Sequence, residues 1–434
     1  MSRKYRVLEY APWLGASPID WDYVKVTYLG KLGRGRVISN LELSPNGKYP
    51  VFSSQTKNKG EMGQIDTYDF DGEYVTWTTD GANAGTVFAR QGKFNCTNVC
   101  GTIKTNDIVS NNFLAYVLSI ETKRYVRIDI NPKLMNTEMA QIRVLVPPYR
   151  EQIKIERYLD QKTSEIDTLI ADKEKLITLL EEKRQAVITE TVTKGLDPNV
   201  KMKDSGIEWI GEIPEHWEVV KLKYIGKSIM GLLYSPKDIC GENEGILVLR
   251  ASNIQRGNID TKRKDNVYVN KEVNENLTTH KNDLLICARS GSRELIGKSA
   301  IIDEESAGNS FGAFTTVYRS VYNPFIRYVF QSGLFQSQIG TYLTSTINQL
   351  TMRNLNNLEI VLPPIEDQDE IQEKLDRYTE NHKQVVKEIK QQISKLKQYR
   401  ESLIYEAVTG KIDLQDYGEV SEPLVAERGE KYGN

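Results

Sequence analysis

An internal repeat constrains the architecture of this chain more than any local motif. Pro147-Pro148 and Pro363-Pro364 each open a helical run, and the two runs align without a gap at a constant offset of 216 residues. The identical pairs include Pro147/Pro363, Gln152/Gln368, Ile155/Ile371, Leu159/Leu375, Asp160/Asp376, Arg184/Arg400, Ile188/Ile404, Glu190/Glu406 and Thr193/Thr409. A duplicated unit of this length requires that a fold assigned to one half also suit the other.

Both runs predict long helices. Neither Gly nor Pro interrupts residues 149–194 or 365–409, and Glu, Lys, Gln and Leu dominate. Apolar residues seven, three and seven apart form a coiled-coil seam in each run. The seam residues are Ile170, Ile177, Leu180 and Val187 in the first run and Val386, Ile393, Leu396 and Leu403 in the second. Because the two seams fall at equivalent positions, we expect the helices to pair with each other, as rods roughly 65–70 Å long.

A second repeat, at an offset of 196, precedes each helix. Its pairs are Trp13/Trp209, Gly15/Gly211, Pro18/Pro214, Trp21/Trp217, Val24/Val220, Lys25/Lys221, Tyr28/Tyr224 and Gly30/Gly226. The chain is therefore a twice-repeated unit of globular domain and long helix. We divide it into a globular domain (1–146), a helical spacer with linker (147–204), a second globular domain (205–362), a distal helical spacer (363–413) and a polar tail (414–434).

Both globular domains show strands separated by polar turns. Residues 74–78 and 85–89 predict strands in the first domain, and residues 284–288 and 298–302 predict strands in the second. The turns between them, 80–85 and 290–297, correspond to each other. A helical segment precedes each long helix, at residues 326–343 in the second domain. The fold class is therefore α+β.

The composition is that of a soluble protein, with 39% hydrophobic and 27% charged residues. No run approaches the roughly 18 apolar residues of a membrane span, so we expect a cytoplasmic protein that does not contact a membrane. Residues 1–146 carry a net charge of +4 and residues 205–362 are neutral, whereas the helices and tail carry −6. The pI of 6.1 therefore does not exclude nucleic-acid binding by the globular domains.

Two sequences resemble catalytic motifs and depart from them. Val146-Pro147-Pro148-Tyr149 is similar to the Asn/Asp-Pro-Pro-Tyr signature of adenine methyltransferases, but Val146 and, in the copy, Leu362 replace the polar residue. Residues 291–299 resemble a phosphate-binding loop, but five residues separate the glycines where four are required. No acid pair, catalytic triad or metal-ligand cluster is recognisable, so we expect a chain that is not an enzyme and holds no cofactor or metal of its own.

Polar and basic side chains gather instead in the turns. Arg can read guanine and Asn or Gln can read adenine in the major groove, while Lys holds phosphates. We therefore predict DNA contacts from Lys57, Asn58, Lys59 and Asn83 in the first domain, and from Arg250, Asn253, Arg256, Arg289, Arg293, Asn348, Gln349 and Arg353 in the second.

Residues 194–217 (KGLDPNVKMKDSGIEWIGEIPEHW) resemble the junction found in specificity (S) subunits of type I restriction-modification systems. The resemblance covers essentially the whole chain, including both Pro-Pro helix starts. It departs at the N-terminus, where residues 10–13 (YAPW) replace the SGIEW of residues 205–209.

The resemblance implies two target-recognition domains separated by two long antiparallel coiled-coil helices, with internal pseudo-twofold symmetry. Each domain would read one half of a bipartite double-stranded DNA target. Two methyltransferase (M) subunits would bind S-adenosylmethionine, and two restriction/translocase (R) subunits that use ATP and Mg could join the hetero-oligomer. Two other interpretations are a solitary DNA adenine methyltransferase built on residues 146–149, which would bind S-adenosylmethionine alone, and a coiled-coil adaptor without DNA affinity.

Overall fold

The computed structural model describes residues 3–9, 11–128, 130–255, 257–342, 348–414 and 417. The chain forms two compact units. Unit 1 contains Met1–Lys173 and Gln391–Asn434, and unit 2 contains Glu174–Lys390. Each unit thus combines one globular domain with part of each long helix.

The two predicted long helices are α3 (Tyr149–Lys194) and α8 (Ile365–Val408). Each starts directly after a Pro-Pro pair, and each is followed by a glycine with positive φ, Gly195 at 78° and Gly410 at 72°. Glycine reaches this left-handed conformation without a steric penalty, and it commonly ends helices. Local sequence therefore sets both ends of each helix.

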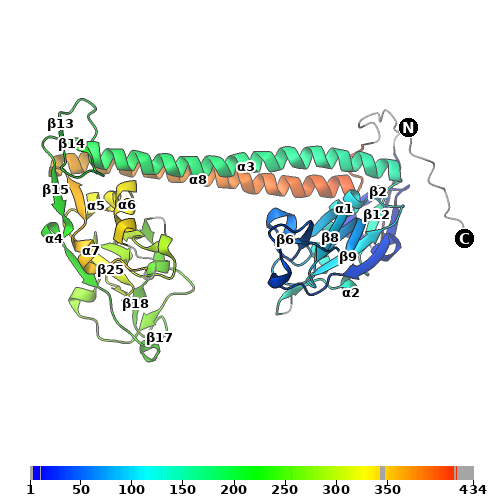
Figure 1. Ribbon diagram of the computed structural model, residues 1–434, viewed down its shortest axis with the longest axis horizontal. Coiled ribbons are helices and arrows are strands. Elements are labelled where there is room, and N and C mark those ends of the chain that lie inside the picture. The colour runs from blue at the N-terminus through cyan, green and yellow to red at the C-terminus, as the bar shows by residue number, and fades with distance from the viewer. Residues whose placement is uncertain are drawn as a thin grey trace, which may run out of the picture. The chain divides into compact units, whose positions relative to one another are not determined.

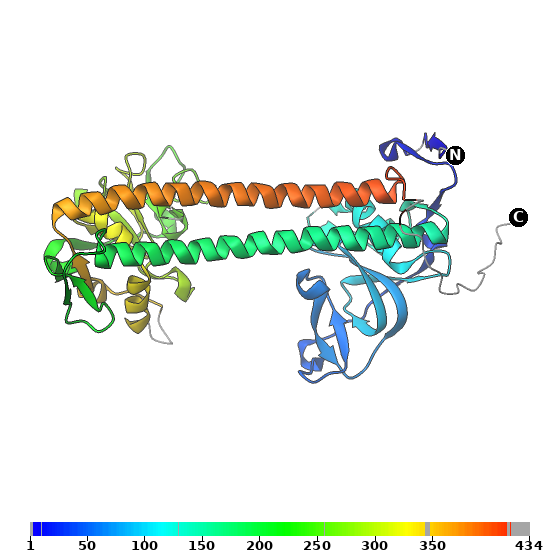
Figure 2. The same ribbon diagram turned by 90° about the horizontal axis from the view of Figure 1, so that it is seen from above.

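In each unit the two helices lie side by side (Figures 1 and 2). In unit 1, Asp167 accepts a hydrogen bond from Arg400 at 2.9 Å, and Lys173 donates one to Gln392 at 2.7 Å. In unit 2, His382 lies 3.6 Å from Glu181. Position numbers fall along α8 as they rise along α3, which confirms antiparallel pairing.

All eight predicted seam residues are buried or half-buried. Ile393 and Leu403 are among the buried ones, at 8% and 5% exposure. The seam also includes Ile166 and Ile389, which are 5% and 7% exposed. Both keep the heptad spacing, since Ile166 lies 14 residues before Leu180 and Ile389 lies seven before Leu396. The heptad seam therefore includes more positions than the four predicted in each helix.

The globular part of unit 1 is built on a six-stranded sheet with the order β4-β9-β7-β8-β5-β6. Its strands are β4 (Gly30–Arg34), β5 (Tyr49–Phe52), β6 (Glu61–Ile65), β7 (Phe70–Thr78), β8 (Val87–Cys96) and β9 (Cys100–Thr105). Smaller pairs are β1 (Tyr5–Val7) with β2 (Ala16–Pro18), β3 (Asp22–Lys25) with β12 (Arg143–Val146), and β10 (Arg127–Ile128) with β11 (Pro132–Lys133). Helices α1 (Asn111–Tyr125) and α2 (Asn136–Met139) complete the domain.

The globular part of unit 2 contains two four-stranded sheets. The first comprises β16 (Lys227–Met230), β25 (Thr315–Arg319), β22 (Leu284–Cys287) and β23 (Ser299–Ile301) in that order. The second comprises β17 (Ile239–Cys240), β21 (Tyr268–Val269), β18 (Ile246–Leu249) and β24 (Ser310–Phe311). Pairs are β13 (Met202–Asp204) with β14 (Glu212–Pro214), β15 (Glu218–Lys221) with β26 (Glu359–Leu362), and β19 (Ile254–Gln255) with β20 (Asn258–Ile259).

Besides its parts of α3 and α8, unit 2 contains the short helices α4 (Leu222–Ile225), α5 (Asn323–Val329), α6 (Gly333–Tyr342) and α7 (Met352–Asn356). They differ from the sequence prediction in one place. The single helix predicted over residues 326–343 is two helices, α5 and α6. The hydroxyl of Ser332, between them, accepts a hydrogen bond from the amide of Phe335 at 3.3 Å, as a capping residue does.

Each domain is joined to the start of its long helix by the same side-chain contacts. The Trp21 indole donates to Glu151 at 3.1 Å in unit 1, and the Trp217 indole donates to Asp367 at 2.7 Å in unit 2. Both indoles are buried, at 1% exposure. The sequence repeat is therefore also a repeat of contacts.

A tyrosine and an aspartate form a second repeated contact. Tyr116 of α1 donates to Asp160 of α3 at 2.6 Å, and Tyr328 of α5 donates to Asp376 of α8. Burial, reinforced by the carboxylate, raises the pKa of both tyrosines well above the usual value. Both hydroxyls therefore remain protonated and act as donors near neutral pH.

Candidate nucleic-acid interface

In unit 2, four of the predicted DNA contacts come together around the turn between β22 and β23. Arg289 forms an isolated antiparallel bridge with Gln349, and the Asn348 amide donates to the Gly291 carbonyl at 3.3 Å. Arg293, in the same turn, donates to the Gly340 carbonyl at 3.3 Å. Both arginines are exposed, so their guanidinium groups are accessible to a ligand.

Phe314 extends this surface, and sequence reasoning did not single it out. The guanidinium carbon of Arg289 lies 5.4 Å from the centroid of the Phe314 ring, which is 62% exposed. An exposed phenylalanine beside an arginine offers both an apolar contact for a base and a cation. The sequence shows only a phenylalanine near the start of β25, and only the tertiary structure shows that its ring is exposed.

The other predicted contacts of unit 2 have different surroundings. Asn253 is 1% exposed, and its amide donates to Asp260 and Asn266 at 2.9 Å, so this residue shapes its loop and is not available to DNA. Arg250 is half-buried and donates to the Asp265 carbonyl. Arg353 is exposed on α7, and Arg256 lies outside the described residues.

In unit 1, the predicted contacts also meet at one place. Lys57, Asn58 and Lys59 form an exposed turn before β6. The Asn83 amide donates to the Ser54 carbonyl at 3.0 Å and thereby joins the 80–85 turn to the loop that carries the lysines. Two segments about 25 residues apart in the sequence thus form one polar surface.

The 80–85 turn of unit 1 and the 290–297 turn of unit 2 occupy equivalent places in their domains. The Leu134 amide donates to the Thr79 carbonyl at 2.9 Å in unit 1, and the Leu350 amide donates to the Ala288 carbonyl at 2.8 Å in unit 2. Leu134 and Leu350 are 216 residues apart, which is the offset of the long helices. The repeat therefore extends upstream of the Pro-Pro pairs to the segments that bond beside the turns.

The neighbouring bridges follow the same offset on one side, at Lys133 and Gln349. Asp80 bridges Lys133 in unit 1 as Arg289 bridges Gln349 in unit 2. Lys133 thus stands where Gln349 stands, and it is a candidate contact that our sequence reasoning missed. Extending the offset of 216 upstream of Pro147 would have found it.

The methyltransferase-like sequence has a structural role. Val146 ends β12 and is 6% exposed, and the Pro147 carbonyl accepts a hydrogen bond from the Gln152 amide at 2.9 Å. Gln368 repeats this bond to the Pro363 carbonyl at 2.7 Å. Residues 146–149 are therefore a strand-to-helix junction, in which Val146 is buried and the Pro147 carbonyl is hydrogen-bonded within the protein.

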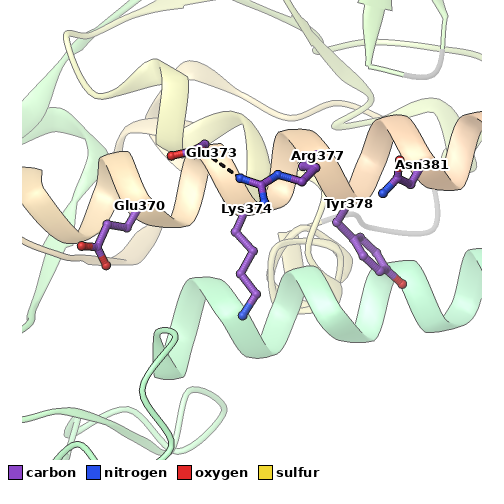
Figure 3. Close-up of a pocket in the computed structure, with 6 residues that line it drawn as sticks. All are labelled: Glu370, Glu373, Lys374, Arg377, Tyr378 and Asn381. Carbon is purple, nitrogen blue, oxygen red and sulfur yellow. Dashed lines mark hydrogen bonds and ion pairs between the residues drawn. The ribbon is translucent and has the colours of Figure 1, made fainter.

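A groove of about 450 Å³ lies on one face of α8 (Figure 3). Its lining residues are Glu370, Glu373, Lys374, Arg377, Tyr378 and Asn381. Glu373 and Arg377 pair at 2.6 Å and are more than 70% exposed, as on a solvated helix face. In the described part of the chain, no group of three or more His, Cys, Asp or Glu residues could hold a metal ion, and no helix is long and apolar enough to cross a membrane.

Two stretches of the chain, residues 18–179 and 214–395, match the type I restriction modification DNA specificity domain. Together they cover most of the sequence. The chain belongs to the type I specificity family. The two matches coincide with the two copies of the internal repeat, so each copy carries one specificity domain.

Curated relatives support the family membership. One stretch is 47% identical over 139 residues to a Mycoplasma pneumoniae protein named as the N-terminus of a type I specificity subunit, covering 31% of this chain and 74% of that protein. Another match, 41% identical over 140 residues, is to the specificity subunit of the type I restriction enzyme MpnII from the same organism. It covers 32% of this chain and 42% of that subunit.

A solved structure shares the fold. It comes from work on complex assembly and conformational transition of the type I R-M system, and it has a TM-score of 0.68 and 14% sequence identity. The similarity covers 91% of this chain and 99% of the other. The α+β architecture with two specificity domains and two long helices is therefore that of the family.

Proposed function

We propose that this chain is the DNA-reading subunit of a type I restriction-modification complex and that each globular domain reads one half of a bipartite target. The observation that carries the proposal is the pair of polar turn surfaces at equivalent places in two related domains. The residues differ between them: Asp80 bridges Lys133 in one, and Arg289 bridges Gln349 in the other. Different side chains on a repeated frame suit two different half-site sequences.

The chain would act without catalytic chemistry of its own. Methyltransferase subunits would bring S-adenosylmethionine and flip the target adenine, and ATP- and Mg-dependent cleavage would belong to restriction subunits. The two long helices would set the spacing of the half-sites and dock the methyltransferase subunits. The junction role of residues 146–149 argues against a solitary methyltransferase, because the buried, apolar Val146 stands where the signature has a polar residue.

Mapping of methylated adenines tests this proposal. The chain is co-expressed with its methyltransferase partner, and modified positions are mapped across the host genome. We expect adenine methylation within one two-part sequence of constant spacing, and loss of that methylation when this chain is omitted. Methylation that persists without the chain, or S-adenosylmethionine binding by the isolated chain in equilibrium dialysis, would contradict the proposal.

A further inference from the structure

The turn that carries Lys57, Asn58 and Lys59 has an uncommon backbone conformation. Asn58 and Lys59 have φ values of 49° and 51°, and Gly60 follows with 89°. A side chain clashes with the backbone in this left-handed region, so two successive non-glycine residues there are costly. Such conformations persist where the surrounding structure holds them, and they concentrate at functional sites.

Arg90 of β8 holds the turn from the protein interior. Its guanidinium donates to the Lys59 carbonyl, and its Nε donates to the Thr76 hydroxyl at 3.2 Å. Gly60 packs against Arg90, and a Cβ added to Gly60 would lie 3.3 Å from the Arg90 guanidinium. Arg90 is 7% exposed, whereas both lysines of the turn are exposed.

The charge of Arg90 is stabilised by aromatic rings, by neutral oxygen atoms and by the carboxylate of Glu61. Its guanidinium carbon lies 3.5 Å from the Phe52 ring centroid and 4.6 Å from that of Phe88. Burial is the main cause that lowers the pKa of Arg90, to about 10, so the group remains charged at neutral pH. A cation held this way keeps its attraction for an anion, and low local polarity strengthens that attraction.

We propose that the turn Lys57–Gly60, supported by Arg90, is a binding site for a phosphate of the DNA backbone in the first recognition domain. Lys57 and Lys59 contact the phosphate, and Arg90 is a positioning residue that keeps the strained turn in place and adds its positive charge. The inference rests on the proposed DNA-reading function. It assigns this turn to sequence-independent anchoring, which is distinct from base reading.

The test measures how DNA affinity depends on salt. The full chain, in complex with its co-expressed methyltransferase partner, is titrated into a fluorescent 40-base-pair duplex of mixed sequence between 50 and 250 mM salt. Three variants are compared with wild type: Arg90→Met, Arg90→Lys and the double variant Lys57→Gln/Lys59→Gln. Lys93→Gln is the matched control, because Lys93 is an exposed cation on the same strand that lies 4.4 Å from the Tyr68 ring.

Each lost phosphate contact should reduce the slope of log K against log salt by about 0.9. We expect the double lysine variant to lose about one to two such contacts. Arg90→Met should show a similar loss, and Arg90→Lys should retain more low-salt affinity than Arg90→Met because it keeps the charge. Lys93→Gln should match wild type.

The outcomes separate this inference from the proposed function. If wild type binds and the double lysine variant has the wild-type affinity and slope, the phosphate site is refuted while DNA reading stands. Because both lysines are exposed, the double lysine variant keeps the protein interior unchanged. It therefore tests the phosphate site even if Arg90→Met fails to fold. If the wild-type complex does not bind duplex DNA, the proposed function itself fails.

Discussion

At the scale of single residues, Gln152 joins the first recognition domain to its long helix. Its buried amide accepts from the Ser110 backbone at 2.8 Å and donates to the Ile108 and Pro147 carbonyls at 3.0 and 2.9 Å. Gln152→Leu would leave the Ser110 amide and the two carbonyls without a partner. Each unpaired group should lower the free energy of unfolding by about 1–3 kcal/mol. We expect urea unfolding to show a larger loss than for Gln368→Leu, the matched change in the copy. Equal losses would show that the extra bonds contribute little.

Arg289 and Arg293 provide a residue-scale prediction about specificity. Both are exposed in the turn that also presents Phe314. A bidentate contact to a base accounts for about 1–3 kcal/mol of discrimination. Arg289→Ala/Arg293→Ala should therefore weaken or relax recognition in one half of the methylated sequence and leave the other half unchanged. Methylation mapped at single-base resolution measures this, and an unaltered motif from a folded variant would remove both residues from the interface.

At the scale of elements, helix pairing depends on the buried seam. Leu403 is 5% exposed, whereas Val385 on the same helix is 44% exposed. Leu403→Ala should cost about 2–5 kcal/mol of unfolding free energy. Val385→Ala should cost less, because its side chain already contacts water. Thermal unfolding followed by circular dichroism compares the two, and a Val385→Ala loss as large as that of Leu403→Ala would contradict the assigned seam.

The same helices are predicted to act as a ruler. In unit 2, His382 lies opposite Glu181, so residues 178 and 384 mark nearly matching points on the two helices. Four helix-forming residues inserted after Thr178 and four after Gln384 add about one turn, roughly 6 Å, to each. At about 3.4 Å per base pair, the gap between half-sites should grow by one or two base pairs.

Two-residue insertions at the same points serve as the control for the ruler. They rotate the seam by about 200° and should prevent pairing. Mapped methylation reports the spacing. Wild-type spacing in an assembled four-residue variant would show that the helices do not set the distance.

At the scale of the whole molecule, each recognition domain should be exchangeable. The second repeat starts at Trp209, and β26 ends at Leu362, directly before the second Pro-Pro pair. Replacing residues 209–362 by the equivalent domain of a relative should change one half of the methylated sequence and preserve the other half. A simultaneous change in both halves would exclude independent reading.

The sequence alone determined the features that depend on local order. The offsets of 216 and 196 predicted a duplicated α+β unit, and the Pro-Pro pairs with the uninterrupted runs after them predicted both helices. These signals are local, since periodicity and turn chemistry act over a few residues. The domain boundaries and the bases read remain predictions.

The tertiary structure alone decided which polar side chains are available and what supports them. It placed Asn253 in the interior of a loop, brought Asn83 to the lysine turn, and exposed Phe314 beside Arg289. It also put Arg90, 31 residues away in sequence, beneath Lys59. The exposure and the hydrogen-bond partners of a polar residue depend on strands that pair across long sequence separations. Composition and residue spacing do not predict which strands pair.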